Sequence, residues 1–512
     1  MRNNLGLILA KRARLCPTVE ALVEVERGRR FTYAELNARA NRIAHGLLAR
    51  GVRPGDRVAL LQMNGVEYIE SYFALAKIGA VLVPLNWRLV ADELEFILND
   101  SGAGLLIFDA EFTETVRLLN GRGTSVRRWI KAGGSEPSEG FAESYEKVAA
   151  ELGAGEPEGA GQDDDLLFIM YTSGTTGRPK GAMHTHDSML WNSLTYNMTC
   201  DQRLGDRDLV VLPLFHIGGL IPLTALIHRG GTCVAIRSYD TRRALETIEK
   251  EHVNTTLLVT TILRMLIDHP DRARYDLSSL RWAIVGGEPV PVSLLERCAE
   301  LGIDVRQDYG QTESGAATIT GPEEAASKRG SAGQPCLHTD VEVVDDQGRP
   351  VAAGTLGEVV VRGRHIMKGY WNRPGATAEA IRDGWLYTGD LGVMDPEGSL
   401  YIKERKKDMI ISGGENVYPA EIEAVLGTHP GIKEVAVIGV PSARWGESPA
   451  AIVVRRGGAE LSAAEVLAFC RGKVAGFKLP RLVEFVDSLP RTVTGKVQKQ
   501  RLRERFPGPA PE

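Results

Sequence analysis

Apolar and polar positions follow two different periods over the first hundred residues. Residues 31–49 place apolar side chains every three or four positions, as an amphipathic helix does, and Thr32 and Glu35 have the spacing of a capping box. The pattern continues with a strand expected at 57–61, a helix at 66–78 and a strand at 80–84. This alternation of strands and helices predicts an α/β fold of layers with parallel sheets.

The composition changes between residues 131 and 165, where Gly, Glu, Pro, Ser and Asp dominate. We expect this segment to be a surface connection with one short helical stretch, rather than part of a domain core. Strands are expected again at 166–171 and 282–285, each followed by a loop and a helix. From about residue 341, short strands with Gly turns indicate a small β-rich subdomain. After a charged run at 403–408, the last hundred residues have the pattern of a separate α+β unit.

Length, charge and cysteine usage limit the class of protein. The 512 residues and the 43% hydrophobic fraction support at least two domains with large cores. The formal net charge is −5, so the overall charge does not indicate a nucleic-acid partner. Six cysteines without a CxxC pair exclude a disulfide scaffold and the usual zinc spacings, and they indicate a reducing, cytoplasmic environment.

No segment has the pattern of a membrane span or of a secretory signal. The most apolar window, residues 72–85, contains Lys77 and is shorter than the roughly 20 residues that a membrane helix needs. We therefore expect no integral span, while a peripheral membrane contact stays open.

Glycine is the residue type whose count stands out. The chain has 56 glycines, whereas average usage of about 7% would give roughly 36. The densest group lies in residues 171–181, YTSGTTGRPKG, a loop after an apolar strand with three glycines, four Ser or Thr hydroxyls and two cations. Such a loop presents backbone N–H groups, hydroxyls and a lysine to phosphate oxygens. It lacks the GK[ST] spacing of a Walker A loop, so it indicates a phosphate-binding loop of another kind.

This loop resembles the phosphate-binding signature of the adenylate-forming (ANL) superfamily of acyl-CoA synthetases, peptide adenylation domains and firefly-type luciferases. Further signatures follow in the same order along nearly the whole chain, at residues 212–216, 309–313, 387–390, 405–408 and 490–496. The resemblance implies a large N-terminal domain (1–404) of layered α/β subdomains with the β-rich subdomain. A hinge (405–408) and a small mobile α+β C-terminal domain (409–512) then follow.

The resemblance also implies an ATP site. Tyr309 would flank adenine, Thr312 would contact phosphate, and Asp390 would accept both ribose hydroxyls. Glu313 and Thr176 would bind Mg²⁺, an ion that takes oxygen ligands and bridges phosphates. The candidate ATP- and AMP-binding residues are Thr172, Ser173, Gly174, Thr175, Thr176, Gly177, Lys180, Gly287, Glu288, Asp308, Tyr309, Gly310, Asp390, Arg405 and Lys496. Glu404, before Arg405, departs from the usual Gly or Asp.

Lys496 resembles the lysine that binds carboxylate and α-phosphate oxygens during adenylation. A well-placed donor of this kind typically contributes about 3–4 kcal/mol to transition-state stabilisation. The candidate catalytic residues are Lys496, Thr312, Glu313 and His216. Lys407 lies where the family hinges its two domains, and a hinge needs a few residues that absorb a φ/ψ change.

The acid and the acyl acceptor are inferred from other positions. Peptide adenylation domains place an aspartate just after the fourth motif, but residues 217–220 contain no acid, and an unpaired buried ammonium would be costly. His216 resembles the aromatic gate of acyl- and aryl-CoA ligases. The candidate acyl-pocket residues are Trp191, His216, Gly218, Gly286, Gln311 and Gly315. The candidate coenzyme A contacts are Arg88, Gly413, Gly414, Trp445, Phe477 and Lys478; Leu479 replaces an arginine of the aryl-CoA ligases.

The expected function is therefore an ATP-dependent acid–CoA ligase with Mg²⁺ as cofactor and with ATP, CoA and a small carboxylic acid as partners. The acid is expected to be a medium- or long-chain fatty acid, with an aromatic acid as the next candidate. An acyl-AMP ligase that loads a carrier protein and a luciferase-like oxidase keep the fold but change the acceptor. A non-catalytic ATP- or CoA-sensing protein is the alternative of another class. Monomer and homodimer both stay open.

Overall fold

The computed structural model describes residues 3–134, 140–150, 153–172, 179–287, 290–412, 415–442, 445–471, 473–474, 476–491 and 495–507. Contacts group the chain into two compact units, and each is described by itself. Unit 1 is Met1–Arg329, Gly333–Val341 and Val361–Tyr387; unit 2 is Gly330–Ala332, Glu342–Val360 and Thr388–Glu512. The domain boundary expected at residue 404 concerns motion rather than contacts, so it stays a prediction.

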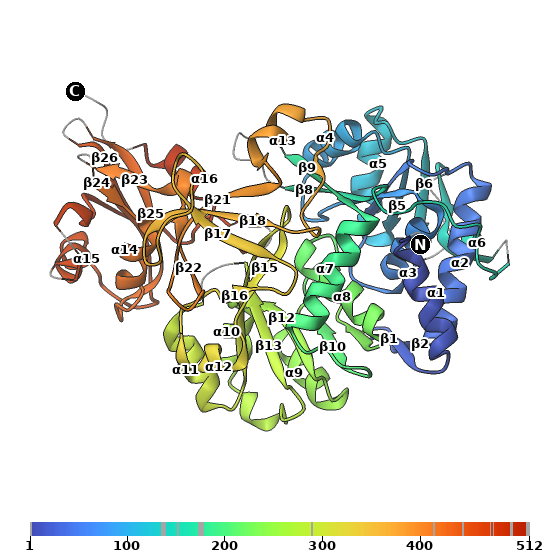
Figure 1. The fold of residues 1–512 in the computed structure, drawn as a ribbon, viewed down its shortest axis with the longest axis horizontal. Helices are drawn as coiled ribbons and strands as arrows, with labels where there is room; N and C mark the ends of the chain where they lie inside the picture. Colours follow the sequence, from blue (N-terminus) through green and yellow to red (C-terminus); the bar gives the residue numbers. More distant parts are fainter. Residues whose placement is uncertain are drawn as a thin grey trace. The chain divides into compact units, whose positions relative to one another are not determined.

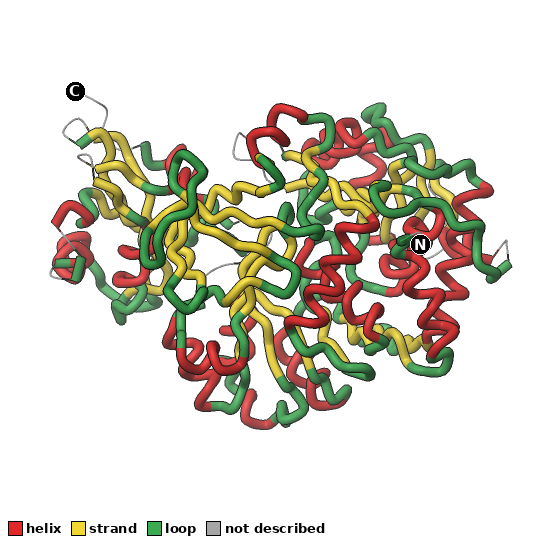
Figure 2. Tube along the Cα trace, viewed as in Figure 1, coloured by secondary structure: helices red, strands yellow, loops and turns green. Residues whose placement is uncertain are grey.

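Two of the described sheets lie wholly within unit 1 (Figures 1 and 2). The first has the strand order β19-β9-β8-β4-β3-β5-β6-β7. These strands are β19 (Gly369–Tyr370), β9 (Lys180–Thr185), β8 (Leu166–Thr172), β4 (Val81–Pro84), β3 (Arg57–Leu61), β5 (Leu105–Asp109), β6 (Arg128–Ala132) and β7 (Ala142–Ser144). From β8 to β7 neighbouring strands are parallel, whereas β9 is antiparallel to both β8 and β19.

The second sheet of unit 1 has the order β16-β15-β14-β13-β12-β10-β11-β1-β2. These strands are β16 (Gln334–Pro335), β15 (Gly315–Ile319), β14 (Val305–Gln311), β13 (Trp282–Gly286), β12 (Thr255–Val259), β10 (Arg207–Val210), β11 (Thr232–Ala235), β1 (Glu20–Glu24) and β2 (Arg29–Thr32). From β14 to β1 the neighbours are parallel, so their carboxyl ends meet at one edge.

Alternate side chains of the strands enter different cores. In β3, Val58 and Leu60 join the core between the two sheets, while Ala59 and Leu61 join the core on the outer face of the first sheet. The inner core is completed by α1 (Gly6–Leu15), α2 (Tyr33–Ala49), α3 (Val66–Ile78), α7 (His186–Thr199) and α8 (Ile217–Arg229). We call this the inner layer.

The outer faces of both sheets are covered by further helices. The first sheet carries α4 (Ala91–Ser101) and α5 (Thr113–Gly121), and the second carries α9 (Thr241–Lys250), α10 (Thr260–Ile267) and α11 (Val292–Glu300). The remaining helices of unit 1 are α6 (Tyr145–Ala150), α12 (Pro322–Ser327) and α13 (Pro374–Ala380). The α/β expectation is confirmed, and so is the capping box of Thr32 and Glu35 at the start of α2.

The expectation for residues 131–165 is partly wrong. β7 adds a strand to the edge of the first sheet, and Tyr145 in α6 is only 1% exposed. The Tyr145 hydroxyl donates to the carbonyl of Glu67 at 3.2 Å, and Glu156 forms an ion pair with the buried Lys77 at 2.7 Å. The polar composition of the segment concealed the few apolar side chains that anchor it to the core.

The third sheet has the order β17-β18-β21-β20, with β22 paired to β21. The division of the chain into two units falls within β17, β18 and β21. The strands of this sheet are β17 (Asp340–Val344), β18 (Leu356–Arg362), β20 (Ile381–Arg382), β21 (Trp385–Met394) and β22 (Leu400–Arg405). This sheet is the β-rich subdomain expected from the Gly turns after residue 341.

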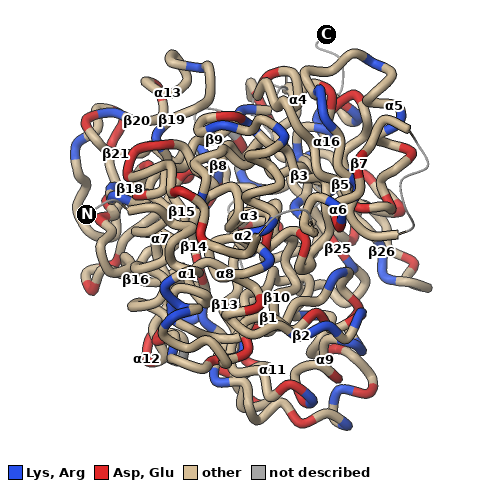
Figure 3. Tube along the Cα trace, turned by 90° about the vertical axis from the view of Figure 1, so that its right-hand side faces the viewer, with Lys and Arg blue, Asp and Glu red and all other residues tan. Residues whose placement is uncertain are grey.

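The fourth sheet forms the core of the C-terminal part of unit 2, with the order β24-β23-β26-β25 and β27 beside β26. Its elements are β23 (Ile410–Ser412), β24 (Glu415–Val417), α14 (Pro419–Leu426), β25 (Ile432–Ser442), β26 (Gly446–Arg455), α15 (Ala463–Cys470), β27 (Leu482–Phe485) and α16 (Lys499–Arg505). Helices α14 and α15 contribute to one core of this sheet, and Leu502 of α16 contributes to another. Helices therefore cover both faces of the fourth sheet. Figure 3 shows acidic and basic segments mixed along the trace, in keeping with the small net charge.

Candidate active site

The hairpin of β8 and β9 fixes both ends of the glycine loop. Thr172 and Lys180 face each other in the antiparallel register, and Thr172 Oγ1 donates to the Lys180 carbonyl at 3.5 Å. The predicted residues Ser173, Gly174, Thr175, Thr176 and Gly177 lie outside the described residues. The pairing of β8 with β9 therefore fixes the backbone position of Lys180 at the end of the loop.

Tyr370 connects two of the predicted ATP-site residues. Its hydroxyl donates to Glu313 Oε1 at 2.9 Å, and Lys180 Nζ lies 5.2 Å from the centroid of its ring. Because β19 pairs with β9, the Tyr370 backbone is held beside Ala182, two residues after Lys180. The Glu313 carbonyl also accepts a hydrogen bond from the Met367 N–H at 2.8 Å. The structure thus brings Lys180 and Glu313 together through a residue that the sequence reasoning missed.

His184 is a second missed residue. It is completely buried, and its Nε2 lies 2.7 Å from the carbonyl oxygen of Thr312. Burial lowers the pKa of His184 to about 4, so at neutral pH the uncharged ring donates this hydrogen bond. His184 therefore fixes the backbone of Thr312 without adding a charge. No signal in the sequence distinguishes it from an ordinary core histidine.

Two predicted site glycines are required by the packing of the protein itself. A Cβ on Gly310 would lie 2.0 Å from the Gly315 carbonyl oxygen. A Cβ on Gly315, whose φ is +63°, would lie 1.9 Å from Asn192 Oδ1. These contacts explain both glycines without any ligand.

The parallel pair β13–β14 places Gly286 opposite Asp308. A Cβ on Gly286 would lie 2.9 Å from both the carbonyl oxygen and Oδ2 of Asp308. Gly287 follows with φ +84°, and the predicted Glu288 lies outside the described residues. The glycine at position 286 is therefore required by the close approach of Asp308 at the carboxyl end of the strands.

The charge of Arg88 acts on His216, although the sequence assigned His216 to the acyl site and Arg88 to the CoA site. Burial, and then the charge of Arg88, lower the pKa of His216 to about 4. The Arg88 guanidinium stacks on Trp87, with its carbon 4.0 Å from the ring centroid, and burial lowers its own pKa. The His216 ring is thus neutral at physiological pH and able to contact an apolar group.

The other predicted acyl residues have different surroundings. A Cβ on Gly218 would meet Leu212 and Leu257 at 3.6 and 3.8 Å, so a small side chain would fit there. Trp191 packs edge-on against His338 at 5.2 Å and lies beneath Arg364 at 4.8 Å. Neither of these Trp191 neighbours belongs to the predicted acyl set.

In unit 2, the predicted ribose-binding pair is assembled by the register of β21 and β22. Asp390 lies opposite Arg405, and its Oδ1 is 3.0 Å from Arg405 Nε. Asp390 is buried, at 4% exposure. The structure therefore brings these two residues together.

The predicted hinge follows β22 as a single turn, Lys406–Asp408. Lys406 forms ion pairs with Asp346 and Glu358 at 3.0 and 3.1 Å. The side chain of Lys407 lies outside the described structure. Glu404, the departure from the family pattern, accepts a hydrogen bond from the Ala420 N–H at 3.0 Å at the start of α14. Glu404 thus has a structural partner within its own unit.

Lys496 is exposed and follows Gly495, whose φ is +90°. The loop around it is closed by a bridge between Arg491 and Val497, and Arg491 also forms an ion pair with Glu434 at 2.8 Å. Residues 492–494 lie outside the described structure.

The predicted CoA contacts of unit 2 are only partly described. Gly413 and Gly414 lie outside the described residues, as does the side chain of Phe477. Trp445 is 38% exposed. Lys478 forms an ion pair with Glu421 at 2.7 Å, so it would have to exchange this partner to contact a phosphate.

Comparisons with known proteins decide the family. The model of the AMP-binding enzyme family matches residues 9–371, and that of the AMP-binding enzyme C-terminal domain matches residues 421–496. The chain belongs to the AMP-binding enzyme family. A feruloyl-CoA synthase of Amycolatopsis sp. and the long-chain-fatty-acid–CoA ligase FadD13 of Mycobacterium tuberculosis are each 43% identical to it. Each alignment covers 99% of this chain and 100% of the relative.

A solved structure supports the same conclusion. The o-succinylbenzoate CoA synthetase of Bacillus subtilis in complex with ATP and magnesium has a TM-score of 0.86 and 34% identity, covering 98% of this chain and 99% of that one. This AMP-binding enzyme is accordingly an AMP-forming acid–thiol ligase of the adenylate-forming superfamily, and its function is acid–CoA ligation. Among the described helices, none combines the length and the apolar character that crossing a membrane requires.

The residues of this AMP-binding enzyme fit a magnesium ion bound mainly through substrate phosphates. Within the described residues there is no group of three or more His, Cys, Asp or Glu side chains that could hold a metal. Glu313 would supply one carboxylate, and its Oε1 accepts a hydrogen bond from Tyr370. Mg²⁺ is usually bound by one or two carboxylates together with phosphate oxygens, so a single oriented carboxylate suits it.

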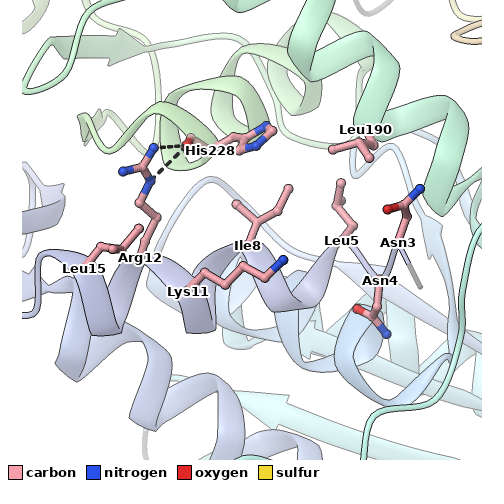
Figure 4. A pocket seen from close by; sticks show the side chains of 9 residues that line it. All are labelled: Asn3, Asn4, Leu5, Ile8, Lys11, Arg12, Leu15, Leu190 and His228. Carbon is pink, nitrogen blue, oxygen red and sulfur yellow. Dashed lines mark hydrogen bonds between the residues drawn. The ribbon is translucent and has the colours of Figure 1, made fainter. Parts of the chain in front are cut away.

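A cavity of about 210 Å³ lies elsewhere in unit 1, between α1 and the helices α7 and α8 (Figure 4). Arg12 donates from Nε to the His228 carbonyl at 2.9 Å on one side of it, and Leu190 of α7 lies on the other. Its lining, within the described part of the chain, includes none of the predicted site residues.

Proposed function

We propose that this enzyme ligates its acid to coenzyme A in two steps at the residues described above. A carboxylate oxygen of the acid attacks the α-phosphorus of ATP and pyrophosphate leaves, giving an acyl-AMP. The thiol of CoA, losing its proton, then attacks the acyl carbon and AMP leaves. The arrangement of Lys180, Tyr370 and Glu313 is the observation that carries this proposal, because one phenol has a cation 5.2 Å from its ring centroid and a carboxylate oxygen 2.9 Å from its hydroxyl.

Each residue has a separate role in the first step. Lys180 attracts phosphate oxygens, and Glu313 would hold Mg²⁺, which when bound neutralises phosphate charge. In unit 2, Asp390 accepts the ribose hydroxyls beside Arg405, and Lys496 stabilises charge that develops on the α-phosphate and carboxylate oxygens. Lys407 lies in the turn about which the C-terminal part would change orientation between the steps.

The acid is proposed to have an apolar body, with a medium- or long-chain fatty acid as the first candidate and an aromatic acid as the second. The neutral His216 and the space at Gly218 support an apolar group near the carboxylate. The relatives support both candidates, because one is named for feruloyl-CoA and another for long-chain fatty acids.

A product assay tests the proposal. The purified enzyme is incubated with ATP, Mg²⁺, CoA and a panel of fatty, aromatic and short acids, and acyl-CoA, AMP and pyrophosphate are measured. We expect equal amounts of the three products with at least one acid. Acyl-AMP that accumulates with CoA but is consumed by a carrier protein would favour the acyl-AMP ligase, as in a relative named as a fatty acid–[acyl-carrier-protein] ligase.

A further inference from the structure

Asp100, near the end of α4, binds two segments that are distant from it in the chain. Its Oδ2 accepts a hydrogen bond from the Tyr171 hydroxyl at 2.7 Å, and its Oδ1 accepts one from Arg373 Nη2 at 2.6 Å. Its carbonyl oxygen accepts a third from Trp371 Nε1 at 3.0 Å. Tyr171 is 71 residues and Arg373 is 273 residues away from Asp100 in the sequence, so one residue connects three separate parts of unit 1.

The partners of Asp100 lie on both sides of β9, the strand that begins with Lys180. In the order β19-β9-β8, Tyr171 belongs to β8, and Trp371 follows directly after β19. Tyr171 faces Gly181 in the register of the hairpin, and the Trp371 N–H donates to the Gly181 carbonyl at 2.8 Å. A Cβ on Gly181 would lie 3.2 Å from the Tyr171 ring, so this ring packs against the backbone beside Lys180. Asp100 therefore holds both neighbours of the residue that follows Lys180.

The contacts of Asp100 also extend to Glu313. The Arg373 N–H donates to the Tyr370 carbonyl at 3.1 Å, and the Tyr370 hydroxyl donates to Glu313 at 2.9 Å. The turn that places this phenol beside Glu313 is thus fixed through Arg373 by the Asp100 carboxylate. The two groups proposed to bind phosphate and magnesium, Lys180 and Glu313, both depend on segments that Asp100 holds together.

These hydrogen bonds are separate from the packing that holds α4 on the first sheet. Leu94, Ile97 and Leu98 of this helix are buried in the core on the outer face of the sheet. The side chains of Asp100 and Arg373 retain 12% and 38% exposure, so their ion pair lies at the margin of that core. A partly exposed ion pair contributes little to the free energy of unfolding. The carboxylate is therefore better suited to fixing the geometry of two segments than to stabilising the fold.

We infer that Asp100 is a positioning residue of the MgATP site, acting through Tyr171 on the β8–β9 hairpin and through Arg373 on the turn that carries Tyr370. The inference rests on the proposed function, because it takes Lys180 and Glu313 as the groups that bind phosphate and magnesium. A misplacement of about 1 Å caused by a distant substitution can lower a rate by about 100-fold. Asp100 should affect reactions of ATP and have little effect on acyl-AMP, which has lost the β- and γ-phosphates.

The test replaces Asp100 by Asn, which keeps the size of the side chain and removes its charge. In ATP–pyrophosphate exchange, we expect Asp100→Asn to raise the KM for MgATP about five-fold or more, while the KM for the acid changes less than about two-fold. Thioester formation from presynthesised acyl-AMP and CoA should keep a rate close to that of the wild type. Asp92→Asn is the matched control, because Asp92 is an exposed residue of the same helix that pairs with Arg122, and it should change none of these quantities.

Tyr171→Phe tests the same connection without altering Asp100. It removes the hydroxyl that donates to Asp100 and keeps the ring that packs against Gly181. The KM for MgATP should rise in this variant by a smaller factor than in Asp100→Asn. In the double variant, the KM should rise by less than the product of the two separate factors, because the two residues share one hydrogen bond. Factors that simply multiply would overturn the action through Tyr171.

Three further outcomes would overturn the inference. Asp100→Asn could behave like Asp92→Asn, or it could slow both half-reactions by the same factor together with a lower Tm, as a purely structural role requires. Alternatively, the KM for the acid could rise while the KM for MgATP stays unchanged, which would place the effect at the acid site. Failure of the proposed function looks different, because the wild-type enzyme would then show no ATP–pyrophosphate exchange with any acid.

Discussion

The phenol of Tyr370 donates a hydrogen bond of 2.9 Å to Glu313 Oε1, and the same ring faces Lys180. Strand β19 contributes Tyr370 from a position 57 residues beyond Glu313 in the chain. Because a hydrogen bond to a charged group is typically worth about 1.5–3 kcal/mol, this contact is able to fix the carboxylate before ATP and magnesium bind.

Tyr370→Phe should therefore lower kcat/KM for MgATP in acyl-AMP formation by about ten-fold or more, since about 1.4 kcal/mol corresponds to a factor of ten. The magnesium concentration needed for half-maximal rate should rise, while the KM for the acid should change less. Steady-state ATP–pyrophosphate exchange measures all three quantities. Tyr275→Phe is the matched control, because its hydroxyl contacts Glu246 at 3.4 Å on an exposed surface. Equal effects of the two substitutions would contradict a positioning role for Tyr370.

Gly315→Ala should destabilise unit 1. The new Cβ would overlap Asn192 Oδ1 and force a side chain into the left-handed region, and each effect typically costs about 1–3 kcal/mol. Thermal unfolding should show a lower Tm. Because Asn192 also donates to the carbonyls of Ser188 and His365, the Asn192→Ala chain is the reference for the overlap, and Gly315→Ala should lower Tm less in that chain than in the wild type. Gly375→Ala, at the start of α13 with no atom within 4 Å of its Cβ, should leave Tm nearly unchanged. A wild-type Tm for Gly315→Ala would contradict the packing.

Asp208 should make stability depend on pH. Burial raises its pKa from 3.8 to about 7 although Thr255 Oγ1 donates to it at 2.6 Å. The unfolded carboxyl group ionises first, so the free energy of unfolding should fall as pH rises from about 4 to about 7 and then level off. Asp208→Asn should remove this fall, and its stability relative to wild type should increase across that window.

Urea unfolding at several pH values measures this difference. Asp276→Asn is the control, because the Ser278 N–H lowers the pKa of Asp276 and its effect is already complete above pH 4. A difference between Asp208→Asn and wild type that does not change with pH would contradict the assigned pKa.

Much of the fold could be predicted because periodicity reports directly on burial. Strand 57–61 and helix 66–78 agree with β3 and α3 to the residue, and every position in α3 is buried, including the charged Glu67, Glu70 and Lys77. The edge strand β7 was missed, because three residues of mixed polarity carry no usable period. The motifs of the site could likewise be located from their order.

The supporting residues of the site could not be predicted, because they depend on pairing across long sequence distances. Tyr370 reaches Glu313 through the β19–β9 pairing, and His184 reaches the Thr312 carbonyl across 128 residues. The sequence assigned both Asp308 and Tyr309 to the nucleotide, and this assignment stays a prediction. The alternation of side chains in β14 points these two neighbours to opposite faces.

In the proposed reaction, Lys496 serves the first step and the turn that contains Lys407 serves the passage to the second. The most direct measurement is the rate of each half-reaction. The first is acyl-AMP formation from acid and ATP, and the second is thioester formation from presynthesised acyl-AMP and CoA. Both rates are measured in Lys496→Ala and Lys407→Pro, and Lys433→Ala, at an exposed position, is the control. We expect Lys496→Ala to lose about 100-fold or more in acyl-AMP formation while thioester formation is largely kept. Lys407→Pro should keep acyl-AMP formation and lose thioester formation. Lys433→Ala should keep both half-reactions. Equal loss of both half-reactions in both variants would contradict the account.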